Sequence, residues 1–200
     1  GISLSYQAGE AYYIPLKHDD DSVQQLDLDI VLKELRPLLE DSSNKIIGQN
    51  IKFDRNVLAK YGVEIASIKN DTMMMSYVLD ASATRHNLDA LSSYYLNYKT
   101  STFEDVAGKG VKQITFDKVP IEAATNYAAE DADITLRLYE ELNPRLEGEG
   151  TLNKLNDEIE IPLIEVLSEM EQNGAILNSK ILNSQSKDVA SSLKQLEETA

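Results

Sequence analysis

Residues 46–54 read IIGQNIKFD, a short apolar run that passes at once into a polar segment with helical spacing. Ile46 and Ile47 predict a brief apolar strand. The apolar residues that follow recur at helical spacing as far as Tyr61, and Gly62 is placed to end that helix. A strand that leads directly into a helix is the building unit of α/β domains, so we expect an α/β fold.

Other segments are predicted as strands or loops from alternation and turn residues. Residues 2–6 and 10–16 are expected to form a hairpin, with Gly9 supplying the turn. A further strand is expected over residues 63–68. Residues 18–22 carry consecutive Asp and His positions and are expected to form a loop exposed to solvent.

Apolar residues at helical spacing predict six further helices. Pro37 is expected to kink or end the first of them early, and Pro144 to close the longest. Asp71 and Asn87 precede two of these segments and are side chains that cap helix N-termini. The predicted helices cover residues 28–39, 72–79, 88–96, 120–142, 152–170 and 179–200.

The sequence Glu-Gly-Glu-Gly at residues 147–150 is typical of a linker. We therefore expect an α/β domain over residues 1–147. Residues 148–200 are expected to form the linker and a helical C-terminal tail.

Composition excludes several classes of site. The chain has no cysteine, so disulfides and thiolate metal sites are excluded. Two histidines, His18 and His86, are too few to favour a zinc site or a Ser-His-Asp triad, so a metal would be a hard cation held by carboxylates. No run of eighteen apolar residues predicts a membrane span, and without a secretion signal we expect a cytoplasmic protein.

The net charge of −15 argues against a protein that grips duplex DNA through a basic face. It leaves room for an enzyme that takes a few nucleotides into a metal-filled pocket, because cations neutralise such a site. An acidic binding module unrelated to nucleic acid is an alternative that only the charge recommends.

Two residue pairs are candidates for chemistry. Asn50 and Asp54 are four positions apart, as are Tyr127 and Asp131, so each pair lies on one helix face. Taken alone, each pair has a structural explanation. Asp54 would be a first-turn carboxylate favoured by the helix dipole, and Tyr127 a core aromatic whose hydroxyl reaches the surface.

Together the pairs resemble the second and third motifs of the DEDD exonuclease superfamily in its tyrosine variety. The resemblance is greatest to the 3′→5′ proofreading exonuclease domain of bacterial family A DNA polymerases, the DNA polymerase I family. Residues 170–174 resemble the segment that opens the polymerase domain of that family. The likeness is carried by Gly48-Gln49-Asn50, Asp54, Asp71-Thr72-Met73, Arg85-His86, residues 107–110 and residues 127–133.

This resemblance implies a ribonuclease H-like exonuclease fold, with a mixed sheet flanked by helices. Residues 1–147 would be the exonuclease domain, and residues 148–200 the linker and the start of a polymerase domain. The family's first motif, Asp-x-Glu, is not found ahead of Gly1. We therefore expect a chain truncated before that motif, with the first strand missing.

The resemblance also implies a reaction. Two divalent ions, Mg²⁺ or Mn²⁺, would support phosphodiester hydrolysis at a mispaired single-stranded 3′ end of DNA. Asp131 and Asp54 would bind metal, and Tyr127 would orient the attacking water, since a phenol is a poor base at neutral pH. Residues expected near the substrate are Gln49, Asn50, Phe53, Arg85 and Phe103.

Alternatives remain at this point. Phe53 and Phe103 are equally well explained as core residues, and Arg85 as an ion-pair partner. The domain could be a degenerate scaffold that braces a polymerase without cutting, or a ribonuclease of the RNase D type. The family's site has four metal-binding carboxylates, two of them from the Asp-x-Glu motif, and this chain retains the other two. By itself the chain is therefore expected to have negligible nuclease activity. Its partners would be the DNA end and the remaining polymerase chain.

Overall fold

The computed structural model describes residues 1–20 and 23–199, so positions 21, 22 and 200 of the predicted loop and last helix lie outside the described residues. The chain divides into two compact units, Gly1–Ser168 and Glu169–Ala200. The first unit holds all the described strands and every predicted site residue, so the architecture below is that of the first unit.

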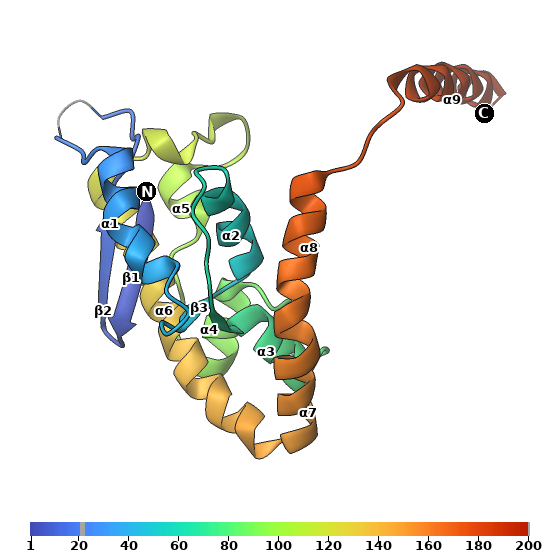
Figure 1. Ribbon diagram of the computed structural model, residues 1–200. Helices are drawn as coiled ribbons and strands as arrows, with labels where there is room; N and C mark the ends of the chain where they lie inside the picture. Colours follow the sequence, from blue (N-terminus) through green and yellow to red (C-terminus); the bar gives the residue numbers. More distant parts are fainter. Residues whose placement is uncertain (21–22, 200) are drawn as a thin grey trace. The chain divides into compact units, whose positions relative to one another are not determined.

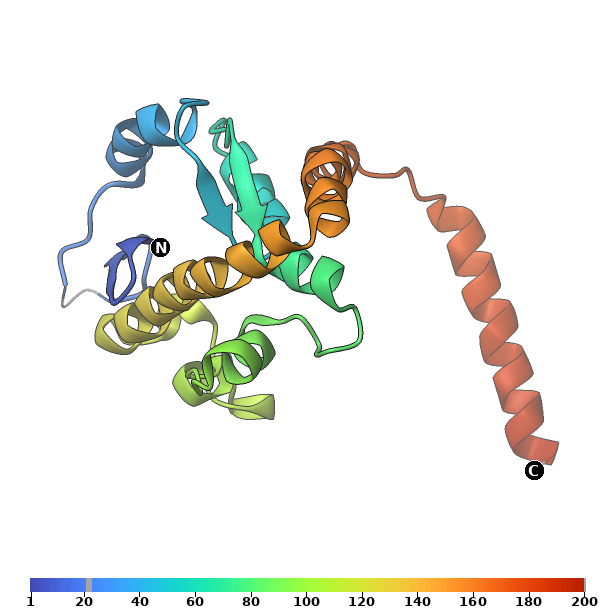
Figure 2. The same ribbon diagram turned by 90° about the horizontal axis from the view of Figure 1, so that it is seen from below.

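The predicted α/β class is confirmed, with strands in two small sheets within the described residues. β1 and β2 form the expected antiparallel hairpin, and β3 pairs with β4 in parallel, as Figure 2 shows. The register of the parallel pair sets Gly48 opposite Asp71, which brings the ends of both strands together. The strands are β1 (Ile2–Gln7), β2 (Glu10–Ile14), β3 (Ile46–Gly48) and β4 (Ile68–Asp71).

Helices cover most of the remaining chain, and all six predicted helical segments are confirmed as helical. The α-helices are α1 (Leu28–Leu39), α2 (Ile51–Ala59), α3 (Thr72–Leu79), α4 (Leu88–Leu96), α5 (Phe103–Ala107), α6 (Ile121–Gly148), α7 (Gly150–Leu155), α8 (Ile161–Asn173) and α9 (Ser179–Thr199). Short helical turns of other types are η1 (Gly110–Lys112), η2 (Phe116–Lys118) and η3 (Asn156–Glu160).

The long helix α6 is the element around which the first unit is built. Its buried side of alanines and leucines packs against the β1–β2 hairpin, against β3 and against α3 and α4 (Figure 1). Leu138 is fully buried with Leu91 of α4, and Leu142 is fully buried with Met75 of α3. This helix therefore carries the Tyr127–Asp131 pair on a rigid, well-packed support.

Neither proline ends its helix, so the expected helix ends at Pro37 and Pro144 are wrong. α1 runs through Pro37 to Leu39, and α6 runs through Pro144 to Gly148. Each proline is exposed, while Leu39 and Leu146 beyond them are buried in core clusters. Burial of the following leucine outweighs the backbone hydrogen bond that each proline removes.

The predicted strand over residues 63–68 is also wrong, because β4 begins only at Ile68. Val63 and Ile65 are nevertheless buried, with 0% and 4% exposed. Their burial comes from helices, since Val63 packs on α1 and Ile65 lies with Ile51 and Ile164. The apolar side chains of this segment are therefore buried, but the backbone pairing of a strand does not form before Ile68.

The expected linker over residues 147–150 is instead a bend between two helices. α6 extends to Gly148, α7 starts at Gly150, and only Glu149 lies between them. The helix predicted after this point is broken by the π-helical turn η3, where Asn156 donates a buried hydrogen bond of 2.7 Å to Asn70. α8 then ends at Asn173, three residues beyond the predicted range.

The loop expected over residues 18–22 is not wholly exposed, because His18 is buried. Its Nε2 lies 2.6 Å from the Tyr13 hydroxyl and its Nδ1 lies 3.3 Å from the Val119 carbonyl oxygen. A ring that can hydrogen-bond at both nitrogens is stable inside a protein, and composition alone gave no sign of these partners. None of the helices in residues 1–20 and 23–199 is long and apolar enough to cross a membrane.

Candidate active site

The first half of the candidate site is the β3–α2 turn, residues 48–54. A Cβ on Gly48 would stand 2.7 Å from the Cβ of Ile51, so only glycine permits this tight turn. Asn50 precedes α2 with a left-handed backbone (φ 58°, ψ 46°), and its side chain makes no capping hydrogen bond. The Asp71 carboxylate instead accepts the Asn50 and Ile51 amide hydrogens, at 3.1 and 2.8 Å.

A chain of polar contacts ties Gln49 to the loop before α4. The Thr72 hydroxyl donates to the Gln49 side-chain oxygen and, at 3.3 Å, to the Gly48 carbonyl oxygen. The Gln49 amide nitrogen donates to the His86 carbonyl oxygen at 2.9 Å. Arg85 is the exposed neighbour of His86, so the structure brings the loop that carries it beside Gln49.

Asp54 and Phe53 both stand on the open side of α2. Phe53 is 64% exposed, so the explanation of Phe53 as a core residue is wrong. Asp54 is exposed as a residue, yet loss of hydration around its carboxylate and the nearby negative Asp71 raise its pKa to about 6. This carboxylate therefore lies where a cation would relieve an unfavourable charge.

The second half of the site is the Tyr127–Asp131 pair on α6. The prediction that these residues share one helix face is confirmed, because both lie on α6 four residues apart and each acts on the pKa of the other. Burial raises the pKa of Asp131 to about 7, the bond from Tyr127 lowers it, and the negative charges of Asp89 and Glu130 raise it further. Burial and the Asp131 charge raise the pKa of Tyr127 as well, so its hydroxyl keeps its proton.

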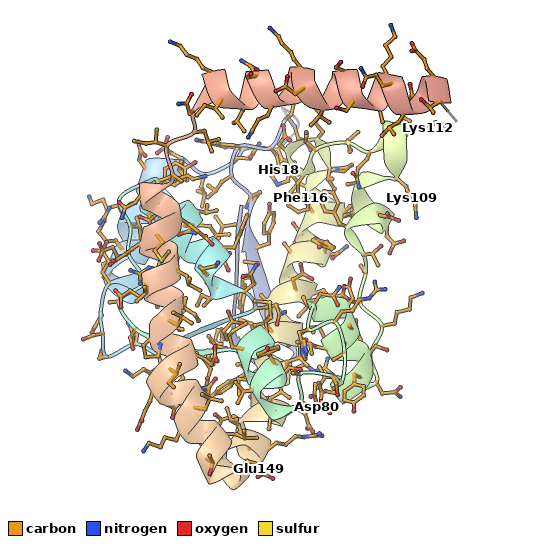
Figure 3. All side chains as sticks on the ribbon, turned by 90° about the vertical axis from the view of Figure 1, so that its right-hand side faces the viewer. His18, Asp80, Lys109, Lys112, Phe116 and Glu149 are labelled. Atoms are coloured by element: carbon orange, nitrogen blue, oxygen red, sulfur yellow. The ribbon has the colours of Figure 1, made fainter. Side chains whose placement is uncertain are left out.

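Three aromatic rings support this second half. The Tyr127 ring centroid lies 5.8 Å from that of Phe116 and 6.4 Å from that of Phe103, and these two phenylalanines are 6.2 Å apart. Phe116 also contacts His18 at 5.7 Å, and Figure 3 shows these two side chains next to each other. Phe103 is 38% exposed, so its ring is shared between this cluster and the surface.

In the first half, a hydrogen bond links Gln49 to the loop that carries Arg85. In the second half, Tyr127 contacts Phe103 and acts on the pKa of Asp131. Within the described residues, no three His, Cys, Asp or Glu side chains lie close enough together to hold a metal ion. Neither Asp54 nor Asp131 therefore belongs to a set of three such side chains among the described residues. The predicted roles of all eight site residues remain predictions.

Sequence reasoning missed three residues that shape the site. The sequence identifies Asp71 as the cap of its own helix and as part of the family resemblance, but not as a partner of the β3–α2 turn, which it also binds. Asp89, next to the Asn87 cap, resembles an ordinary first-turn acid, although its charge acts on Asp131. Phe116 carries no signal in the sequence, because only the folded chain brings its ring to Tyr127.

Comparison with known proteins gives a consistent set of relatives. A model of the 3′-5′ exonuclease family matches residues 1–147. DNA polymerase I of Pseudomonas aeruginosa is 47% identical over 203 residues, covering 100% of this chain and 22% of that protein. DNA polymerase I of Rhizobium leguminosarum is 40% identical over 197 residues, covering 94% of this chain and 19% of that protein. The chain thus spans about a fifth of the length of these relatives.

A solved structure has a similar fold. The POL domain of Pol1 from M. smegmatis, in complex with DNA primer-template and dNTP, matches with a TM-score of 0.63. The match covers 84% of this chain and 25% of that one, at 20% sequence identity. At this identity the likeness concerns the fold alone.

Proposed function

The chain belongs to the 3′-5′ exonuclease family, and from this premise we propose that it is the proofreading exonuclease domain of a DNA polymerase I. In this proposal it hydrolyses the last phosphodiester bond at a mispaired 3′ end of DNA, in replication and repair. The remaining polymerase chain and the single-stranded DNA end are its partners. The relatives named DNA polymerase I favour this proposal over an RNase D-type ribonuclease.

The Tyr127–Asp131 pair carries the proposal: the two residues lie four positions apart on α6, and the Asp131 carboxyl is in surroundings that raise its pKa to about 7. A surface carboxylate with a purely structural role gains nothing from a site crowded by Asp89 and Glu130. Perturbed carboxyl groups in such surroundings are typical of catalytic or cation-binding positions. The raised pKa values of Asp131 and Asp54 both describe carboxylates that a divalent ion would stabilise.

The donor chemistry fits Mg²⁺ or Mn²⁺ in type but not in number. Both ions prefer carboxylate oxygens, and Asp54 and Asp131 supply them. Two divalent ions, when bound, would supply charge neutralisation and a more acidic water. A complete site needs more ligands than these two carboxylates, so we propose that the 200-residue chain alone has negligible nuclease activity.

The protein's own groups have separable tasks in this proposal. Tyr127 remains protonated at neutral pH, so its hydroxyl would hold and orient the attacking water and would not remove its proton. The exposed Phe53 ring and the partly exposed Phe103 ring would stack on bases, a contact that every base can make. Gln49, Asn50 and Arg85 would lie along sugar and phosphate.

A nuclease assay tests the proposal. DNA with a labelled, mispaired 3′ terminus is incubated with Mg²⁺ or Mn²⁺ and the full polypeptide that carries these residues. Asp131→Asn should lower the cleavage rate on the order of 10³-fold, because it removes a metal donor. Glu140→Gln, an exposed change on the same helix, serves as the matched control and should leave the rate unchanged.

Two further measurements distinguish an incomplete nuclease from a non-catalytic scaffold. The 200-residue chain alone should be inert with either ion. If the full polypeptide is also inert with both ions, the domain is a scaffold and the proposal is wrong.

A further inference from the structure

We propose that Asp71 is a positioning residue of the candidate active site, holding the starts of two helices and thereby fixing where Asn50 and Asp54 stand. The inference deepens the proposed exonuclease function and rests on it. Asp71 is 1% exposed, lies at the end of β4 and belongs to neither predicted motif pair.

The Asp71 carboxylate accepts four backbone amide hydrogens. One oxygen receives those of Met73 and Met74, at 2.9 and 3.4 Å, and so caps its own helix α3. The same oxygen receives the Asn50 amide at 3.1 Å, and the other oxygen receives the Ile51 amide at 2.8 Å. The last two amides belong to the start of α2, which lies well before Asp71 in the chain.

α2 needs this outside partner because it has no cap of its own. The first amides of a helix lack partners within the helix, and α1 and α4 satisfy theirs with the side chains of Asp27 and Asn87. The side chain of Asn50 makes no such bond, and its backbone is left-handed, a conformation that non-glycine residues rarely adopt. Asp71 satisfies the amide of this left-handed residue and the amide that follows it.

The contact between Asp71 and the start of α2 determines where the Asp54 carboxylate, the candidate metal ligand, lies. Asp54 stands in the first turn of α2, four residues after Asn50, so any rotation of the helix start moves its carboxylate. Gly48 lies opposite Asp71 in the β3–β4 register, so the β3–α2 turn and the Asp71 side chain that binds it follow their strands at the same end of the sheet. Thr72, next in sequence, holds the Gly48 carbonyl oxygen and the Gln49 side chain.

The bonding also argues against Asp71 as a metal ligand. Both of its oxygens already receive amide hydrogens, three on one oxygen and one on the other. A carboxylate so engaged would have to release a helix start in order to bind a cation. Its chemistry suits alignment, and Asp54 is the carboxylate left on the open side.

Asp71→Asn separates the two tasks of this side chain. An asparagine oxygen can still cap α3, as Asn87 caps α4, but its amide group then meets the Ile51 amide donor to donor. In the full polypeptide we expect kcat for release of the 3′ nucleotide to fall about 10–100-fold, as when a partner that orients a metal ligand is lost. KM for the DNA end should change little.

The matched control is Asp27→Asn, at a carboxylate that caps only α1 and is exposed. It should keep kcat and cost little in Tm, because the asparagine oxygen can still accept the same two amide hydrogens of α1. Amide hydrogen exchange gives a readout that does not depend on activity. In Asp71→Asn, peptides over residues 48–56 should exchange at least several-fold faster, with residues 73–79 unchanged.

The outcomes are distinguishable. Unchanged exchange over residues 48–56, unchanged kcat, or loss of protection throughout Gly1–Ser168 would each overturn the positioning role. An unsubstituted polypeptide that shows no exonuclease activity would overturn the proposed function, and the exchange result would still decide whether Asp71 holds the start of α2.

Discussion

The two halves of the candidate site are held in place by different forces. The β3–α2 turn depends on directional hydrogen bonds, chiefly those that Asp71 accepts from Asn50 and Ile51. The α6 half depends on a long packed helix and on the rings around Tyr127. A turn held by hydrogen bonds loses its conformation when one partner is removed, whereas a ring that packs against several others stays in place when one contact is lost. We therefore expect single substitutions to lower kcat strongly in the first half, which we call brittle, and weakly in the second half, which we call tolerant.

The two carboxylates also differ in what perturbs them. Burial is the largest cause of the raised pKa in both. Asp54 is then raised by Asp71, the residue that holds its helix, while Asp131 is raised by Asp89 and Glu130 and lowered by its bond from Tyr127. Both carboxylates therefore carry a charge that a bound cation would stabilise, with different neighbours responsible in each half.

Gly48→Ala should break the brittle half and have a larger effect than any change to the rings of the tolerant half. Its new Cβ would collide with the Ile51 side chain at 2.7 Å and push the start of α2 away from Asp71. We expect kcat to fall roughly 10–100-fold and stability to fall by about 1–3 kcal/mol. Steady-state kinetics and thermal melts measure both effects. Gly150→Ala, where a Cβ meets nothing within 4 Å, is the control; equal effects at both glycines would refute the collision.

Phe116→Leu probes the tolerant half and should have a smaller effect. It removes ring contacts to Tyr127 and Phe103 but keeps an apolar side chain between them. We expect kcat to fall only about 2–10-fold, as expected for one or two aromatic contacts. Tyr12→Leu, which breaks the exposed Tyr6–Tyr12 stack, is the matched control. A loss as large as that of Gly48→Ala would show that the two halves are equally brittle.

The pH dependence of stability tests the charges assigned to the Asp131 and Asp54 carboxylates. A carboxyl whose pKa is raised on folding binds its proton more tightly when folded, so its ionisation destabilises the fold. For Asp131 this cost is absent below its ordinary value of 3.8, grows as pH rises, and is complete above about 7. Asp131→Asn should therefore be the more stable protein at pH 8 in a chelator, on the order of 1 kcal/mol, and lose that advantage at pH 4.

Asp54→Asn should show the same sign with a smaller advantage, complete above about pH 6. Thermal melts at pH 4, 6 and 8 measure both curves. A stability difference that stays constant across this range would show that neither carboxyl carries the charge assigned to it.

Local features of the sequence predicted local features of the site. Tyr127 and Asp131 are one helical turn apart, so spacing alone placed them on one face, and the continuous helix α6 through both residues confirms it. The strand-to-helix turn at residues 46–54 and the cap that Asp71 gives α3 were equally readable, since each involves neighbours in the chain.

Contacts between distant residues could not be predicted. Asp71 binds Asn50 and Ile51 across a parallel strand pair whose register the sequence does not state. The prediction of a strand at Val63 is wrong because alternation reports burial without saying whether a sheet or a helix provides it. Likewise Pro144 does not end α6, since burial of Leu146 keeps the helix intact beyond it.

A double-substitution cycle tests most directly whether the two halves form one metal-dependent site. The kcat for 3′-nucleotide release is measured in the full polypeptide with Mn²⁺ for Asp54→Asn, Asp131→Asn and the double substitution. If both carboxylates serve one reaction, the double substitution should be no slower than the worse of the two single ones, because either loss already disables the site. Losses that multiply would contradict this account and leave Asp54 and Asp131 with independent structural roles.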